Sequence, residues 1–122
     1  MNSEKGFAII EILISIALLG IVAAALLSAL ATTSQASIIS NEQAIAESLV
    51  RSEIEYIKNC DYQYSATEYP TDPTLTIPDG WAVPPPVVSP VHATDDGIQE
   101  VTVTAEHNGR TMLSVTIYKV DR

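Results

Sequence analysis

The sequence predicts an α+β protein in which a long N-terminal helix packs on a small C-terminal antiparallel sheet. Residues 21–60 contain no Pro or Gly, so a helix there has no signal to stop. All seven prolines lie between Pro70 and Pro90, and two runs of alternating apolar and polar residues flank Asn108-Gly109, as is typical of a β-hairpin. The chain therefore divides into five segments: 1–6, 7–30, 31–60, 61–97 and 98–122.

Residues 7–30 form an apolar run without Lys, Arg, Asp, Asn or Pro. As a helix the run would be roughly 36 Å long, against roughly 30 Å of bilayer hydrocarbon. It is therefore predicted to span a membrane with some tilt. Glu11 lies inside this run, and an ionisable residue at such a position is a functional candidate by default. The alternative is that Glu11 reaches water at the interface and only marks where the helix enters the lipid.

Segment 1–6 joins the apolar run through Gly6-Phe7-Ala8-Ile9-Ile10-Glu11. This arrangement resembles the N-terminus of the type IV prepilin family, whose members have a leader ending in Gly, a Phe as first mature residue and a Glu at the fifth mature position. The resemblance implies that a prepilin peptidase cuts between Gly6 and Phe7 on the cytoplasmic side and methylates the new amino terminus of Phe7. It also implies that Glu11 pairs with the N-terminal ammonium group of a neighbouring subunit in a filament.

Two departures from the family pattern bear on the subtype. Ala8 stands at the second mature position, where Thr is common, and Ser28 lies near where many major pilins have a Pro. Without that Pro the helix has less reason to kink. These features favour a minor pilin or pseudopilin. The length and the single small sheet look most like an I-type minor pseudopilin of a type II secretion system, and a minor pilin of a type IV pilus or competence system also fits.

The resemblance further implies the partners: the prepilin peptidase, other pilin or pseudopilin subunits, an inner-membrane assembly platform and membrane lipid. Lys5 precedes the span and Arg51 is the first cation beyond it, so the positive-inside rule places the N-terminus in the cytoplasm and residues 31–122 outside. Two other functions stay open. One is a bitopic anchor that displays a binding module and never polymerises. The other is a secreted acidic protein cleaved near Ala29-Leu30-Ala31.

Composition limits the ligands. The chain has a net charge of −9 over 122 residues, and its six basic residues are scattered. Binding of phosphates needs clustered Lys and Arg, so direct nucleic-acid binding is not expected. The single cysteine, Cys60, excludes an intrachain disulfide and is expected to pack at the helix end. His92 and His107 are isolated and no phosphate-cradling Gly motif occurs, so neither an enzyme nor a cofactor is predicted.

Residues 31–60 are predicted to continue the helix in amphipathic form. A continuous helix over residues 7–59 would measure roughly 80 Å. Its apolar stripe is expected to face the sheet, and charged residues are expected on the opposite side. The stripe consists of Ile38, Ile45, Leu49, Val50, Ile54 and Ile57, and the opposite face of Glu42, Glu47, Glu53, Glu55 and Lys58.

Segment 61–97 reads as a long irregular connection, in which Pro84-Pro85-Pro86 favours polyproline II. Loops of this length are usually functional or disordered, so this segment is the first candidate for partner contact. Asp95-Asp96-Gly97 could offer carboxylates to Ca²⁺, but the remaining oxygen ligands are lacking. The motif is therefore interpreted as a turn, and no metal is predicted.

Segment 98–122 is predicted to form a hairpin. A two-residue Asn108-Gly109 turn would place Val103 opposite Ser114 and mix the two faces. A three-residue loop over 107–109, with Gly109 in a left-handed bulge, would place Val103 opposite Leu113 and Val101 opposite Val115. The apolar face of that hairpin is expected to cover the helix stripe.

Overall fold

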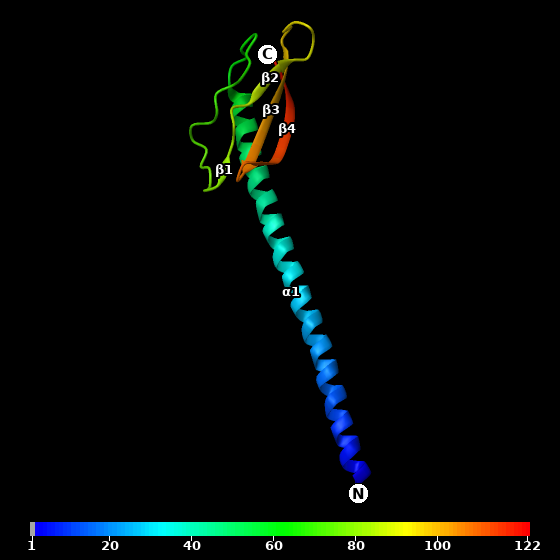
Figure 1. Cartoon of the computed structure of the whole chain (residues 1–122). Helices are drawn as coiled ribbons and strands as arrows, with labels where there is room; N and C mark the ends of the chain where they lie inside the picture. Colours follow the sequence, from blue (N-terminus) through cyan, green and yellow to red (C-terminus); the bar gives the residue numbers. More distant parts are fainter. Residues whose placement is uncertain (1) are drawn as a thin grey trace. The chain divides into compact units, whose positions relative to one another are not determined.

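The computed structural model describes residues 2–122, apart from the side chain of Asn2, and its main helix is α1 (Asn2–Asn59) (Figure 1). The helix begins earlier than the expected position near Phe7, so residues 2–6 are also helical. The chain forms two compact units, and the boundary between them lies between Ile39 and Ser40.

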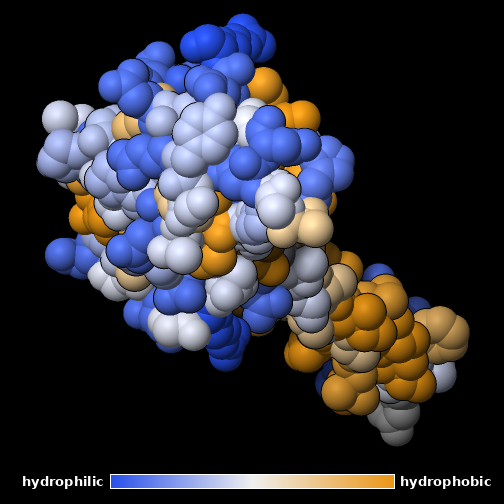
Figure 2. All heavy atoms as spheres, turned by 90° about the horizontal axis from the view of Figure 1, so that it is seen from above, coloured by the Kyte–Doolittle hydropathy of each residue, from blue (hydrophilic) through white to orange (hydrophobic). Residues whose placement is uncertain are grey.

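The first unit is helical and exposes every described side chain. Three of its hydroxyls bond within the helix: those of Ser15, Thr32 and Thr33 each donate to the carbonyl four residues earlier, at 2.8–3.0 Å. The exposed side chains of residues 7–30 are apolar except for Glu11 and two serines, and the visible part of this unit in Figure 2 has mostly the colour of hydrophobic residues. Such a surface requires lipid or other apolar helices as its surroundings.

The second unit confirms the predicted α+β class. The last turns of α1 pack on an antiparallel sheet of β1 (Trp81–Ala82), β2 (Val87–Pro90), β3 (Ile98–His107) and β4 (Arg110–Val120). β3 is central, because β1 and β2 pair with successive stretches of one of its edges and β4 pairs with the other (Figure 1). The Pro-rich segment is thus less irregular than predicted. Its two strands escaped prediction because they are short and lie beside prolines, which edge strands tolerate.

The core lies between α1 and the inner face of the sheet. Four apolar helix residues are buried there, and three apolar residues of β3 are fully buried opposite them. Tyr69, from the segment after the helix, and Val83 and Val88 complete the cluster. The core residues of α1 are Ala46, Leu49, Val50 and Ile57, and those of β3 are Val101, Val103 and Ala105.

The hairpin register differs from the prediction. His107 pairs with Arg110 around a two-residue turn, and Val103 lies opposite Val115 rather than Leu113. A β-bulge in the ladder, where Ala105 and Glu106 face Leu113 and Thr111, takes up the extra residue that keeps the apolar residues on one face. The prediction that rejected a two-residue turn in favour of a three-residue loop is thus wrong. It placed the irregularity in the turn, whereas the structure has it within the strands.

The position of Glu53 also differs from the prediction. It was predicted on the polar side of the helix, yet its side chain is fully buried. Glu53 lies four residues after Leu49 and four before Ile57, which places it on the apolar stripe. Both of its carboxylate oxygens accept from the backbone N–H of Asp72, at 3.1 and 3.3 Å. The buried carboxylate therefore holds the first part of the Pro-rich segment against the helix.

Candidate functional site

The sequence-predicted site residues all lie on the N-terminal part of α1. Phe7 is 79% exposed, and a methyl group added at Gly6 would have no neighbouring atom within 4 Å. The peptide bond between Gly6 and Phe7 is therefore flanked by one residue without a side chain and by one whose aromatic ring is exposed. Cleavage at this bond would require the stretch to unwind, because backbone groups in a helix are paired internally.

Glu11 follows Phe7 by one helical turn, so both side chains lie on the same face of α1. The Glu11 backbone carbonyl accepts a hydrogen bond from Ser15 Oγ at 2.8 Å. Its carboxylate is exposed, and no cationic group lies within 4.0 Å of it among the residues that the structure describes. A carboxylate in apolar surroundings gains most from a cation supplied by another molecule.

Comparison with known proteins bears on this N-terminal segment. Residues 1–27 match the family model of the prokaryotic N-terminal methylation motif. The chain carries a prepilin-type N-terminus. This match supports its place among the type IV prepilins and pseudopilins. Searches of curated proteins and of solved structures gave no match to the chain.

The prepilin-type motif implies processing by a prepilin peptidase and assembly with other pilin subunits. It points to a structural, pilin-like protein. The helix that carries the motif is long and apolar enough to cross a membrane, which fits a membrane-anchored prepilin. The roles of Gly6, Phe7 and Glu11 themselves remain predictions.

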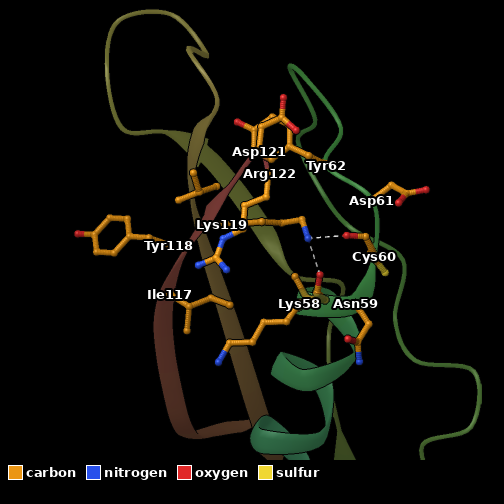
Figure 3. A pocket seen from close by; sticks show the side chains of 12 residues that line it. Lys58, Asn59, Cys60, Asp61, Tyr62, Ile117, Tyr118, Lys119, Asp121 and Arg122 are labelled. Atoms are coloured by element: carbon orange, nitrogen blue, oxygen red, sulfur yellow. Dashed lines mark hydrogen bonds between the residues drawn. The ribbon is translucent and has the colours of Figure 1, made fainter.

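In the second unit, Lys119 closes the C-terminal end of α1. Its side chain is only 8% exposed, and its ammonium group donates to the carbonyl oxygens of Ile57 at 2.7 Å and Cys60 at 2.6 Å (Figure 3). The last carbonyls of a helix lack intrahelical partners and carry a partial negative charge, so a cation there is favourable. The ammonium also lies 5.4 Å from the centre of the Tyr69 ring.

Asp95 organises the segments that join the helix to β3. Its carboxylate accepts from the Tyr62 hydroxyl, from Ser65 N–H at 2.7 Å, from Gln99 Nε2 at 2.6 Å and from Gly97 N–H at 3.2 Å. Burial raises the pKa of this carboxyl, but the four hydrogen bonds outweigh burial and lower the pKa to about 2. Asp95 is therefore ionised at neutral pH.

The same network extends into the core through Gln99. The Tyr69 hydroxyl donates to Gln99 Oε1 at 3.0 Å, and Gln99 Nε2 also donates to the Gln63 carbonyl at 2.8 Å. Burial and the hydrogen bond to Asp95 together raise the pKa of Tyr62. The predicted Asp95-Asp96-Gly97 turn is thus present, with its first carboxylate occupied by donors from this chain.

A second cluster joins the hairpin turn to the helix. The ring of His107 stacks on Trp81, with 4.6 Å between centroids, and His107 Nδ1 lies 3.3 Å from a Glu42 carboxylate oxygen. Asn108 N–H donates to the Gly80 carbonyl at 2.8 Å. His107, which appears isolated in the sequence, therefore joins the end of the hairpin to Trp81 and to the helix.

Sequence reasoning missed the roles of Glu53, Asp95 and Lys119. For two of them a signal was present. Glu53 follows Leu49 by four residues, and Lys119 continues the alternation of Leu113, Val115 and Ile117. A charged residue in phase with apolar ones indicates a buried, hydrogen-bonded charge. For Asp95 the sequence indicated only the local turn with Gly97, because the donors Tyr62 and Ser65 come from a separate part of the chain.

Proposed function

We propose that this protein is a minor pilin or pseudopilin, a structural subunit of a type II secretion or type IV pilus-like filament. The subunit is stored in the membrane by residues 7–30 and assembles through the same helix. Its N-terminus lies in the cytoplasm, and the unit from Ser40 onward lies outside it.

One observation carries the proposal: the methylation motif coincides with an exposed apolar helix that holds Glu11 one turn after Phe7. In lipid the carboxylate stays near the interface. In a filament the apolar helices surround it, and the free amino group of Phe7 in an adjoining subunit supplies the cation. Because removal of one partner leaves an uncompensated buried charge, such a pair enforces correct register during assembly.

The first experiment is the intact mass and N-terminal sequence of the protein taken from membranes of a host with a prepilin peptidase. A start at methylated Phe7 supports the proposal. A start at Met1 favours the bitopic anchor, and a start after Ala31 favours a secreted acidic protein.

The second experiment separates anchoring from assembly. Glu11→Ala should leave membrane insertion and processing intact but abolish recovery of the protein in sheared filaments or abolish secretion. Glu4→Ala is the matched control, because Glu4 leaves with the leader and its loss should not affect assembly. Normal assembly of Glu11→Ala would contradict the charge-pair role.

A further inference from the structure

Strand β4 has one edge without a hydrogen-bonded neighbour in the described part of the chain. β4 pairs only with β3, whereas the opposite edge of the sheet is covered by the segment after the helix. There Glu68 bridges Val87, and Val88 N–H donates to the Thr67 carbonyl at 2.9 Å. An open edge presents a row of backbone N–H and C=O groups to any extended segment that can pair with them.

Between the bulge near its start and the inward-pointing Lys119 near its end, the β4 edge carries none of the features by which proteins usually block edge pairing. Its sequence, Arg110–Val120, contains no Pro, Gly, Asp or Glu. Lys119 is the one charged residue that points inward, and its ammonium is occupied by the carbonyls of the helix end. The β2 edge, in contrast, ends in Pro90 and follows three consecutive prolines. β4 is therefore open to pairing.

The apolar layer beneath β4 is also incomplete. The inward residues Val101, Val103 and Ala105 of β3 are fully buried. Their counterparts on β4 contact the same core but are only partly buried; these are Leu113, Val115 and Ile117. A further strand beside β4 would cover these three side chains, as β4 covers those of β3.

A cleft of about 590 Å³ lies between the end of β4 and the end of α1 (Figure 3). Ile117 lines it together with Lys58 and Arg122. Neither of these two cations has a carboxylate oxygen within 4.0 Å among residues 2–122, although the chain has a net charge of −9. Asp121, also in the lining, accepts from the Tyr64 hydroxyl at 2.6 Å, and Asp61 points away from both cations (Figure 3).

We propose that the free edge of β4 binds an extended segment of a partner protein, which adds a strand to the sheet. Alternate side chains of that segment are apolar and cover Leu113, Val115 and Ile117, and acidic side chains at one end lie beside Lys58 and Arg122. Backbone pairing supplies affinity in this mode, and alternate side chains supply specificity. This proposed binding does not depend on the methylation motif.

The charges argue against a second copy of this chain as the occupant. Pairing of β4 with its own copy would bring a second Arg110, Lys58 and Arg122 close to the Arg110 of this edge and to the Lys58 and Arg122 of the adjoining cleft. Like charges across an interface disfavour association, whereas acidic residues opposite the same cations favour it.

The test uses the full chain in detergent micelles and a synthetic peptide that alternates Val and Thr and ends in two Asp residues. Fluorescence anisotropy measures binding, and hydrogen exchange measures protection of β4. The acidic peptide should bind and slow the exchange of alternate β4 amides. A peptide with two Lys in place of the Asp residues should bind about tenfold more weakly.

Charge reversal in the protein provides the reciprocal test. The double variant Lys58→Glu, Arg122→Glu should bind the acidic peptide about tenfold more weakly. Arg51→Glu, an exposed cation of α1 outside the cleft, should bind as the unchanged chain does. Equal binding of the two peptides, or binding without slower β4 exchange, would overturn the proposal. Concentration-dependent protection of β4 without peptide would also overturn it, because the occupant would then be a second copy.

Discussion

The ammonium nitrogen of Lys119 lies 2.6 Å from the carbonyl oxygen of Cys60, so strand β4 supplies the group that closes the end of α1. A second hydrogen bond, to the Ile57 carbonyl at 2.7 Å, makes the same side chain a bridge between two turns of the helix end. The hairpin and the helix are thus joined by this polar contact at the end of α1, in addition to the contact between His107 and Glu42 near the hairpin turn.

Lys119→Met should lower the free energy of unfolding of the second unit by about 2 kcal/mol, because it leaves two carbonyls without their charged donor. Met retains most of the apolar side chain, so the loss reports the hydrogen bonds. Urea unfolding of the full chain in micelles, followed by fluorescence of Trp81, measures the change. Lys58→Met, at an exposed position, should stay within about 0.5 kcal/mol of the unchanged chain. Equal effects of the two variants would refute the capping role.

Asp95→Asn should destabilise the second unit at neutral pH, since an amide cannot accept all four hydrogen bonds. The pKa of Asp95 is lowered to about 2 in the folded state, so its stabilisation is present above the ordinary pKa near 3.8 and is lost as the pH falls towards 2. Urea midpoints at pH 7 and pH 2.5 should therefore differ less between variant and parent at the lower pH. Asp96→Asn is the control, and a pH-independent difference for Asp95→Asn would contradict this account.

Glu53→Gln should stabilise the second unit near neutral pH and above. Burial raises the pKa of Glu53, although the Asp72 N–H bond lowers it, and the Asp72 carboxylate raises it further. A raised carboxyl pKa means that stability is greatest below the ordinary value of 4.5 and is lost as the pH rises through the folded-state pKa. Gln keeps an acceptor for the Asp72 N–H without the buried charge. The gain should disappear below pH 4 and be absent in the exposed control Glu55→Gln; a loss of stability at pH 7 would show that the charge itself is needed.

Gly109→Ala should cost about 1 kcal/mol, because Gly109 has a φ of +77° and an added methyl would meet no atom within 4 Å. Gly80→Ala should cost more. Gly80 has a φ of +80°, and its added Cβ would lie 3.1 Å from the Asn108 side-chain oxygen. Thermal unfolding of the two variants side by side tests this order. Equal losses would mean that the Asn108 side chain moves away freely.

The sequence predicted those features that depend on local pattern. The absence of Pro and Gly over residues 21–60 indicated the helix, and alternation around Asn108-Gly109 indicated the hairpin. The register was wrong by two residues. The alternation of apolar and polar residues alone cannot distinguish a bulge in the turn from a bulge within the strands, because both keep Val103 on the apolar face.

Within the candidate site, prediction depended on whether the chemistry is local. The spacing of Gly6, Phe7 and Glu11 indicated a prepilin-type N-terminus, and the family match covers that segment. The network around Asp95 was not predictable in this way. Its donors Tyr62 and Ser65 lie 33 and 30 residues before it and come together only when the fold is known.

The partner that completes the end of α1 is encoded 62 residues after Ile57. Until β4 has been made, the last carbonyls of α1 lack the ammonium group that they bond in the finished fold. A chain that stops before Lys119 therefore keeps an unclosed helix end. Limited proteolysis of such a truncated chain should accordingly cut near residues 57–60 faster than it cuts the full chain, so that the last strand of the chain decides how well the end of its first element is protected.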